Sequence, residues 1–346
     1  MEKSTIGRAF LSFAMLVFCI SGNTYSQQIV PLTMGTKTSL RGLSVINNSV
    51  AWVSGSNGYT GITTDGGKNW KWAQIAGYET FDFRDIEAFS ATEAVIVNAG
   101  SPAVILLTRD GGHSWKEVYR NSSPEIFLDG MDFWNRNHGI IYGDPIAGEM
   151  QLLETRDGGD TWDNISGQLK INLAAGEASF AASGTAIRTG KHGNVWIATG
   201  GTQSRIFHSK DFGKNWQAYT CPIIQGENST GPFSLAFLNN KIGVAAGGNY
   251  LKDTLRANNL VTTSDGGQSW KMPKVNPFGY RSAIEFISKK VLVTTGSSGT
   301  DISMDGGNIW ENISKEGFNC VRRAKKGDMI LLTGSNGTIC RLNLRD

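Results

Sequence analysis

Seven segments of this chain share one position at which most of the residues are charged. The position is occupied by Arg41, Arg84, Asp129, Glu177, Ser234, Arg281 and Asn319. Arginines bind carboxylates and phosphates through paired hydrogen bonds, and a pair of carboxyl groups can cleave a glycosidic bond. The set therefore predicts an anion-binding site or a glycan hydrolase that uses Glu177 and Asp129. A self-compensating ion network is the alternative that needs no ligand.

A repeated structural unit must position these residues, and the sequence contains one. Six segments follow the pattern Ser/Thr-x-Asp-Gly/Phe-Gly-x-x-Trp, the Asp box. Their aspartates are Asp65, Asp110, Asp157, Asp211, Asp265 and Asp305, which lie 45, 47, 54, 54 and 40 residues apart. Adjacent glycines permit the positive φ of a tight turn, the Asp accepts turn amides, and the Trp covers apolar area. We therefore expect these aspartates to be structural turn residues rather than catalytic ones.

The spacing of the boxes is typical of four-stranded propeller blades. A seventh unit, with strand-like runs at 318–324, 329–333 and 338–342, ends without a box or a fourth strand. The β-prone segment 29–33 supplies the missing strand, and such closure removes an exposed sheet edge. The sequence therefore predicts an all-β, seven-bladed β-propeller over residues 27–346, closed by its N-terminal strand.

In such a propeller the shared charged position falls where the innermost strand of each blade begins. An apolar residue precedes six of the seven members, as Leu40 precedes Arg41 and Tyr280 precedes Arg281. Because side chains alternate along a strand, we expect the apolar residue in a blade interface and the polar one at the channel axis. Loops that reach the same channel mouth add Asn98, Asp144, Asn249, Tyr250 and Lys252 as possible rim residues.

Residues 1–26 have the pattern of a secretory signal peptide. Lys3 and Arg8 precede an apolar run over 9–20, and small and polar residues follow. Phe18 argues against lipid attachment at Cys19, because that processing requires a small residue before the cysteine. No other segment approaches the roughly 18 apolar residues of a membrane-spanning helix. We expect an exported protein in the periplasm, on the cell surface or in the medium.

Charge and cysteine usage restrict the possible partners. The formal net charge of +3 is too small for an electrostatic nucleic-acid binder. Three cysteines follow the predicted signal peptide: Cys221, Cys320 and Cys340. Because this number is odd, and because Cys320 and Cys340 fall on strands that are not neighbours, we expect no disulfide. The four histidines lack ligand spacing and no dinucleotide fingerprint is present, so we predict no metal and no cofactor. The expected oligomeric state is a monomer.

Six segments outside the boxes carry a family resemblance. They are 40–43, 51–55, 83–86, 126–129, 143–145 and 279–282. Together with the boxes, which are bacterial neuraminidase repeats, they resemble bacterial relatives of the photosystem II stability and assembly factor family over residues 29–346. The resemblance implies a seven-bladed propeller and a non-catalytic helper in the assembly of membrane complexes. Some relatives bear an oxidoreductase label, but this sequence has no cofactor motif to support it.

Sialidases share these boxes and provide the contrasting prediction. They require an arginine triad, a Tyr-Glu pair and an acid-base Asp, and Arg41, Arg84, Arg281, Tyr280, Glu177 and Asp129 supply these types. The Arg-Ile-Pro signature is absent, however, and the sequence has seven units rather than six. We therefore predict a non-catalytic scaffold that holds an acidic partner segment or an anionic ligand at the channel mouth. The alternative is a glycoside hydrolase that uses Glu177 and Asp129.

Overall fold

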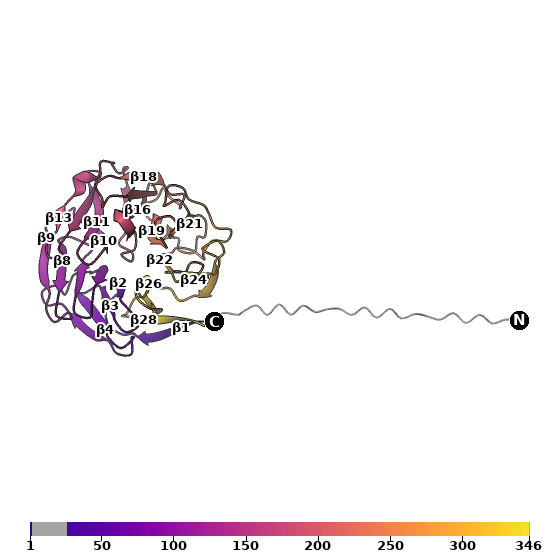
Figure 1. Ribbon diagram of the computed structural model, residues 1–346, viewed down its shortest axis with the longest axis horizontal. Coiled ribbons are helices and arrows are strands. Elements are labelled where there is room, and N and C mark those ends of the chain that lie inside the picture. The colour runs from indigo at the N-terminus through magenta and orange to yellow at the C-terminus, as the bar shows by residue number, and fades with distance from the viewer. Residues whose placement is uncertain (2–25, 346) are drawn as a thin grey trace.

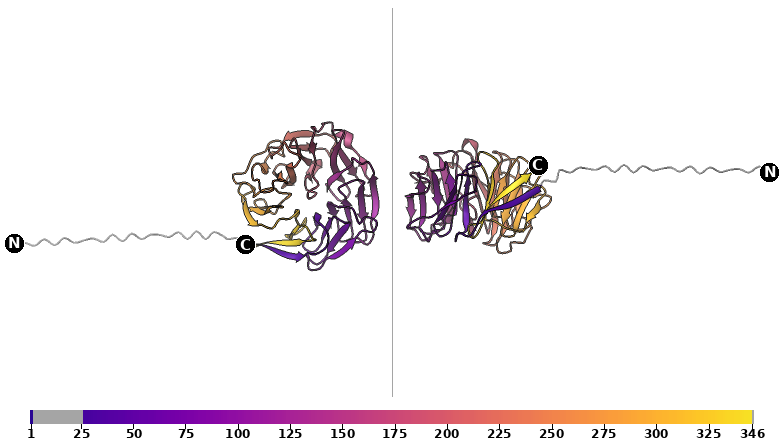
Figure 2. Two further views of the ribbon diagram at one scale, coloured as in Figure 1. Left: turned by 180° about the vertical axis from the view of Figure 1, so that it is seen from behind. Right: turned by 90° about the horizontal axis from the view of Figure 1, so that it is seen from below.

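A computed structural model describes Met1 and residues 26–345 of the chain. Seven antiparallel sheets stand side by side in a ring, each radiating outward from a central axis (Figure 1). Seen from the side, the strands cross the thickness of a short cylinder (Figure 2). The predicted seven-bladed β-propeller is confirmed.

The first three blades each have four strands. Blade 1 contains β2 (Leu40–Val45), β3 (Ala51–Gly55), β4 (Tyr59–Thr63) and β5 (Lys71–Gln74). Blade 2 contains β6 (Asp85–Ala88), β7 (Ala94–Val97), β8 (Ala103–Thr108) and β9 (Lys116–Asn121). Blade 3 contains β10 (Leu128–Phe133), β11 (Gly139–Ile146), β12 (Glu149–Thr155) and β13 (Asp163–Asn164), followed by the 3-10 helix η1 (Ser166–Gln168).

The remaining blades are less uniform. Blade 4 contains β14 (Glu177–Ala178), β15 (Ile187–Thr189), η2 (Lys191–Gly193), β16 (Val195–Gly201), β17 (Arg205–Ser209) and β18 (Gln217–Thr220). Blade 5 contains β19 (Thr230–Phe237), β20 (Gly243–Asn249) and β21 (Leu260–Thr263). Blade 6 contains β22 (Ala283–Phe286), β23 (Leu292–Gly296), β24 (Gly299–Ser303) and β25 (Glu311–Ser314). Blade 7 contains β26 (Cys320–Arg323), β27 (Ile330–Thr333), β28 (Ile339–Arg345) and β1 (Ser26–Thr33).

The N-terminal strand completes the last blade, as predicted. β1 pairs antiparallel with β28, with Ile29 opposite Leu342 and Pro31 opposite Cys340. The sheet order is β1-β28-β27-β26, so the two ends of the described chain lie together in one blade (Figure 1). This pairing covers an edge that would otherwise be open. The predicted signal peptide lies outside the described residues, except for Met1 and Ser26.

Two blades depart from the four-strand plan. In blade 4 the innermost strand is interrupted, and β14 and β15 both pair with β16. In blade 5 the fourth strand is reduced to a bridge between Thr262 and Lys271. Pro273 lacks an N–H donor and stops this pairing two residues later, after which Val275 bridges to Ile309 of blade 6.

The Asp boxes form turns between the third and fourth strands, as predicted. In the first box the Thr63 hydroxyl donates to Asp65 Oδ1 at 2.9 Å and accepts the Gly67 N–H at 2.9 Å. The backbone and side-chain N–H groups of Asn69 hold the Asp65 carboxylate, which lowers the pKa of Asp65 to about 2. Gly66 and Gly67 have φ of 76° and 87°. Every hydrogen bond of this carboxylate to the described residues lies within the turn.

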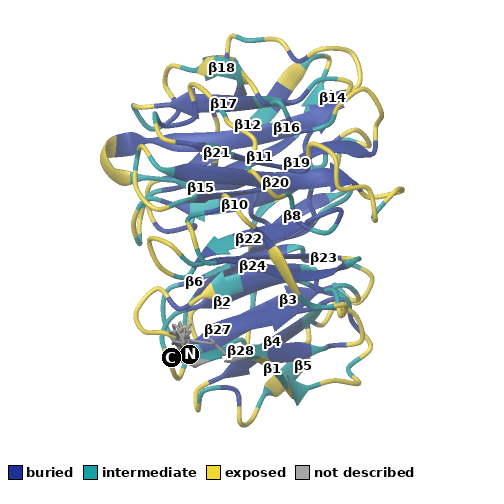
Figure 3. Ribbon diagram, turned by 90° about the vertical axis from the view of Figure 1, so that its right-hand side faces the viewer, coloured by how far each residue is buried: buried dark blue, intermediate teal, exposed yellow. Residues whose placement is uncertain are grey.

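The core lies between adjacent blades and is apolar. Strand faces are buried, whereas exposed residues concentrate in the loops at both ends of the cylinder (Figure 3). Trp52 and Trp196 are 1% and 0% exposed, and each fills a blade interface. Cys221, Cys320 and Cys340 are buried free thiols. As expected, β27 separates the strands that carry Cys320 and Cys340.

Candidate functional site

The central channel has two mouths, because the innermost strands begin at one end of it and finish at the other. The start mouth is a cavity of about 440 Å³ lined by Arg41, Arg84, Asp129, Asp144, Asn319, Phe127, Phe180, Phe233, Tyr250 and Tyr280, among others. The end mouth is a cavity of about 280 Å³ lined by Glu87, Asp132, Arg188, Glu285, Arg322 and Lys325, among others. The first contains most of the predicted site.

Four of the seven residues at the shared position, Arg41, Arg84, Asp129 and Asn319, gather in the start mouth together with the loop residue Asp144. Arg41 Nη1 donates to the carbonyl oxygen of Ala182 across the channel at 2.8 Å. Arg84 Nε lies 2.7 Å from Asp82 Oδ2, and both side chains are partly exposed. Asn319 Nδ2 donates to the Leu40 carbonyl at 3.0 Å. Two cations therefore face the same cavity, and Arg41 has no carboxylate partner among the described residues.

β-Bulges turn several side chains into this mouth. In β2 the register shifts between Leu40 and Gly42, so Arg41 has no partner across the strand. The same irregularity surrounds Asp129 in β10 and Phe233 in β19. A bulge leaves its extra residue unpaired and bends the strand locally, which re-aims the side chain. Three of the seven blades thus present the mouth with a residue outside the regular alternation.

Two carboxyl groups share the start mouth. Asp129 is 1% exposed, and neither of its carboxyl oxygens has a hydrogen-bond partner among the described residues. Burial and the nearby Asp144 raise the pKa of Asp129 well above its usual range, against an opposing effect of Arg84. Burial also raises the pKa of Asp144, whose Oδ1 accepts the Ser179 N–H at 2.9 Å. This environment favours the neutral form of both acids.

An aromatic wall faces the arginines, and sequence reasoning did not predict it. Phe180 stacks on Phe233 with ring centroids 3.9 Å apart, and Tyr280 meets Phe233 edge-on at 4.9 Å. Tyr280 is buried in a blade interface, as expected, and it also lines the cavity. Tyr250 adds a more exposed ring, 6.4 Å from Tyr280. The mouth therefore combines charged groups with an aromatic lining.

The prediction that Glu177 faces the channel was wrong. Its side chain is fully buried and lies 2.5 Å from Arg205 Nη2. Arg205 Nε donates to the same carboxylate at 2.9 Å, and so does the hydroxyl of Thr199 at 2.5 Å. Glu177 thus stabilises blade 4 from inside. It does not share an opening with Asp129, so the predicted catalytic pair is not assembled.

Arg281 and Ser234 are also absent from the start mouth, contrary to the prediction. Arg281 is 0% exposed, and its Nε donates to Asp301 Oδ2 at 2.8 Å within blade 6. The Ser234 hydroxyl is buried between blades, 2.5 Å from Thr185 Oγ1, and accepts the Ile284 N–H at 2.9 Å. Both side chains serve the packing of the propeller.

A one-residue error in register explains these misplacements. The backbone N–H groups of Leu40, Phe83 and Arg281 each donate to a glycine carbonyl of the preceding blade, at 3.0, 3.0 and 2.9 Å. Arg281 therefore matches the apolar position, and Ser282 is the true counterpart of Arg41. A shift of one residue moves a side chain to the opposite face. In blade 5 the bulge falls on Phe233, which is therefore the counterpart of Arg41. The predicted residue Ser234 stands one position too late in the chain.

Of the loop residues expected at the rim of the start mouth, some line the cavity and others do not. Tyr250 and Asp144 line the start mouth. Asn98 and Asn249 are buried and bond to their own loops, for example through Asn249 Oδ1, which accepts the Leu251 N–H at 2.9 Å. Lys252 lies outside the cavity lining and pairs with Glu227 at 2.8 Å.

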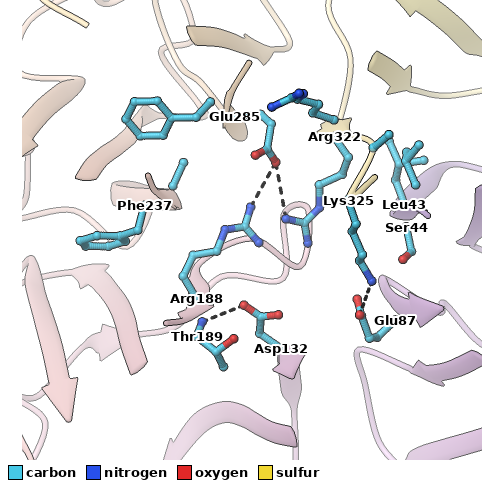
Figure 4. A pocket seen from close by; sticks show the side chains of 15 residues that line it. Leu43, Ser44, Glu87, Asp132, Arg188, Thr189, Phe237, Glu285, Arg322 and Lys325 are labelled. Carbon is cyan, nitrogen blue, oxygen red and sulfur yellow. Dashed lines mark hydrogen bonds and ion pairs between the residues drawn. The ribbon is translucent and has the colours of Figure 1, made fainter. Parts of the chain in front are cut away.

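The sequence analysis did not predict a site at the end mouth. One residue from each blade forms a ring there: Ser44, Glu87, Asp132, Arg188, Ala236, Glu285 and Arg322. Glu285 lies between the guanidinium groups of Arg188 and Arg322, at 3.8 and 3.7 Å (Figure 4). The sequence does contain a signal for this ring, because three of its residues follow members of the shared charged position at a constant spacing. Glu87, Asp132 and Arg322 stand three residues after Arg84, Asp129 and Asn319. Strict alternation from those members points to the intervening apolar residues instead.

Neither mouth contains the elements of a metal site. Within residues 26–345, no three His, Cys, Asp or Glu side chains gather closely enough to hold a metal ion. The helices of this part are short 3-10 turns, and none has the length and apolar character needed to cross a membrane. The chemistry available at the mouths is therefore that of guanidinium, carboxyl, amide and aromatic groups.

Sequence comparisons place these features in a family context. The family described as photosynthesis system II assembly factor YCF48 matches residues 23–124. The photosystem II assembly lipoprotein Ycf48 of Synechococcus sp. (strain CC9902) is 22% identical over 276 residues, which is 70% of this chain and 78% of that protein.

Solved structures show the same fold. YCF48 bound to D1 peptide is 15% identical with a TM-score of 0.66, covering 92% of this chain and 97% of that one. YCF48 from Cyanidioschyzon merolae is 16% identical with a TM-score of 0.66, covering 91% and 98%. A xyloglucanase from Xanthomonas campestris is 13% identical with a TM-score of 0.61, covering 91% and 53%. The last shows that an enzyme can share this architecture.

The ring of seven sheets and its turns define the protein as an Asp-box β-propeller. It is a relative of the photosystem II assembly factor family, as the resemblance in the sequence implied. The matched family and the matched cyanobacterial protein are both described as photosystem II assembly proteins.

Proposed function

We propose that this protein is an exported, non-catalytic scaffold whose start mouth holds an acidic segment of a partner protein. The observation that carries the proposal is Arg41, a partly buried guanidinium whose hydrogen bond goes to a neutral carbonyl oxygen. Burial and the neighbouring Arg84 lower the pKa of Arg41, so an approaching anion would relieve both effects. Arginine suits this role because its planar donors match a carboxylate.

The carboxyl groups of the same mouth do not cancel these cations. Burial raises the pKa of Asp129 and of Asp144, which favours their neutral forms, and Arg41 has no carboxylate partner among the described residues. A protonated carboxyl group can itself donate a hydrogen bond to a bound carboxylate. The mouth is therefore electrostatically suited to an anion despite its mixed composition.

The aromatic wall supports a peptide over a free small anion as the occupant. Phe180, Phe233 and Tyr280 offer an apolar surface beside the arginines, where an apolar side chain next to an acidic residue would fit. One protein with the same fold has been solved bound to D1 peptide, which is a protein segment held by a propeller of this kind. A small anionic or glycan ligand remains the competing occupant.

The test compares two double variants with equal loss of charge. Arg41→Gln/Arg84→Gln alters the start mouth, whereas Lys116→Gln/Arg120→Gln alters the outer strand β9. Tagged wild type and variants are incubated with native envelope extract, and retained proteins are identified by mass spectrometry. The binding segment is then mapped with synthetic peptides. We expect the mouth variant to bind the mapped peptide at least tenfold more weakly and the β9 variant to bind it like wild type.

Other outcomes would redirect the proposal. Equal retention by both variants, with unchanged melting curves, would show that the partner binds elsewhere and would overturn it. An empty profile from all three proteins would favour the small-ligand or hydrolase alternatives, which glycan and small-anion screens with Asp129→Asn as control would then separate. Export is tested separately by fractionation of the native cells and by N-terminal sequencing. An intact N-terminus on cytoplasmic protein would contradict it.

A further inference from the structure

The end mouth concentrates charge that the proposed function does not use. Arg188, Arg322, Arg323 and Lys325 supply cations, and Glu87, Asp132 and Glu285 supply carboxylates, all around one cavity (Figure 4). These groups lie at the opposite end of the channel from Arg41 and Arg84. They form either a compensated plug or a second binding site, and their individual contacts decide between the two.

Two of the three carboxylates already have their own partners. Asp132 accepts the backbone N–H groups of Phe133 and Thr189, each at 2.8 Å. Glu87 pairs with Lys325, whose Nζ also donates to the Ala88 carbonyl at 3.1 Å. Glu285 is therefore left as the carboxylate that faces the arginines of the ring.

Glu285 does not satisfy those two arginines. The ion-pair distances of 3.8 Å to Arg188 and 3.7 Å to Arg322 are both longer than a hydrogen bond. Arg188 Nε donates to the Leu235 carbonyl at 2.8 Å, but its Nη2 is buried without a hydrogen-bond partner among residues 26–345. The residue as a whole is 8% exposed. An unpaired buried donor on a charged group is costly unless a ligand supplies an acceptor.

Arg322 presents its donors to the same space. Its side chain is 17% exposed, and within the described residues its guanidinium makes no hydrogen bond. Two guanidinium groups thus converge beside one carboxylate, and their donors remain open to a further oxygen acceptor. Phe237 and Phe286 form an apolar part of the wall and limit the room to about 280 Å³, which suits a small molecule.

We propose that the end mouth is a second binding site, which takes a small oxyanion, a phosphate or a carboxylate, between Arg188 and Arg322. Each guanidinium offers paired N–H donors that match two oxygens of such a group. Glu285 is the internal competitor of the ligand and weakens its binding. The site is independent of the start mouth and of any partner held there.

Calorimetric titration tests this site with inorganic phosphate and with succinate as separate probes, in a low-salt buffer without other oxyanions. We expect saturable binding of at least one probe, with one ligand per chain. Arg188→Gln and Arg322→Gln should each weaken it at least tenfold. Glu285→Gln should strengthen it several-fold, because it removes the competing charge and keeps the shape of the side chain. The preferred probe distinguishes a phosphate site from a carboxylate site.

Two controls keep the result interpretable. Arg41→Gln/Arg84→Gln should leave probe binding unchanged, and if it abolishes binding, the anion occupies the start mouth and the proposal fails. Arg188→Gln could also loosen the fold by removing the bond to Leu235, so Arg322→Gln, which breaks no hydrogen bond, is the decisive variant. Saturable binding that is equal in wild type, Arg322→Gln and Glu285→Gln would overturn the proposal. So would the absence of binding of both probes to wild type.

Discussion

The two mouths of the channel are built from the same seven blades, yet they reach their composition by different routes. At the end mouth, each blade contributes one ring residue at a regular strand position. At the start mouth, bulges and loop insertions replace that regularity, and they bring aromatic rings such as Phe233 and Tyr250 beside Arg41. Regular alternation produces a ring of charges, whereas interrupted alternation produces a cavity that combines charged groups with an aromatic lining.

The sharpest difference lies between an arginine inside a blade and an arginine at a mouth. Arg281 and Asp301 are both fully buried, so Asp301→Asn would leave an uncompensated buried cation. We expect a loss of about 3–5 kcal/mol in the free energy of unfolding, measured by chemical denaturation. Arg84→Gln, which breaks a partly exposed pair, should cost within about 1 kcal/mol. Equal costs would mean that Arg281 and Arg84 occupy similar environments, as the sequence analysis predicted when it placed both at the channel axis.

A buried carboxyl group between the two mouths, that of Asp85, should make the stability of the fold depend on pH. Asp85 is 2% exposed, and burial raises its pKa to about 7, against opposing effects of Arg322 and the Met131 N–H. The pKa is higher in the folded state than the roughly 3.9 of an unfolded chain, so the neutral form stabilises the fold. This stability is fully present below about pH 4 and is lost as pH rises toward and through 7. The loss is at most about 4 kcal/mol.

The matched variant for this effect is Asp85→Asn, followed by denaturation at several pH values between 4 and 8. Its slope of stability against pH should be flatter than that of wild type. The slope carries the test, because one amide oxygen cannot replace both acceptors of the Met131 and Ile86 amides. Glu285 at the end mouth adds a dependence of the same sign, since burial raises its pKa also. An unchanged slope in Asp85→Asn would assign the effect to Glu285 instead.

The fold was predictable from local signals that repeat. The Asp-box turns, the blade spacing and the unpaired segment 29–33 each followed from the sequence, because turn geometry and edge closure depend on few residues. The site was predictable where the strand alignment held, as at Arg41, Arg84 and Asp129. It failed at Glu177, Ser234 and Arg281, where the alignment of the blades was off by one residue, and this alignment depends on backbone contacts within and between blades. The distance of Glu177 from the mouth could not be foreseen without its partner Arg205, which lies on another strand.

The smallest effect concerns binding rather than stability, and it separates the chemistry of the mouths. The pKa of Asp129 is raised by burial and by Asp144, so the group is neutral at low pH and ionises as pH rises. An ionised Asp129 would repel an acidic peptide from Arg41 and Arg84. Wild type should therefore lose several-fold in affinity for the mapped peptide as pH rises and Asp129 ionises, whereas Asp129→Asn should hold its affinity. Fluorescence anisotropy measures both curves.

The end mouth supplies the comparison that makes this last prediction informative. Glu285 acts there as a competitor of the ligand, so Glu285→Gln should change oxyanion binding and leave the pH profile of the peptide as in wild type. If Glu285→Gln altered the peptide profile as much as Asp129→Asn did, the two mouths would be electrostatically coupled through the channel. If neither variant altered it, the carboxyl groups would stay neutral throughout, and the peptide would be recognised through the aromatic wall and the arginines alone.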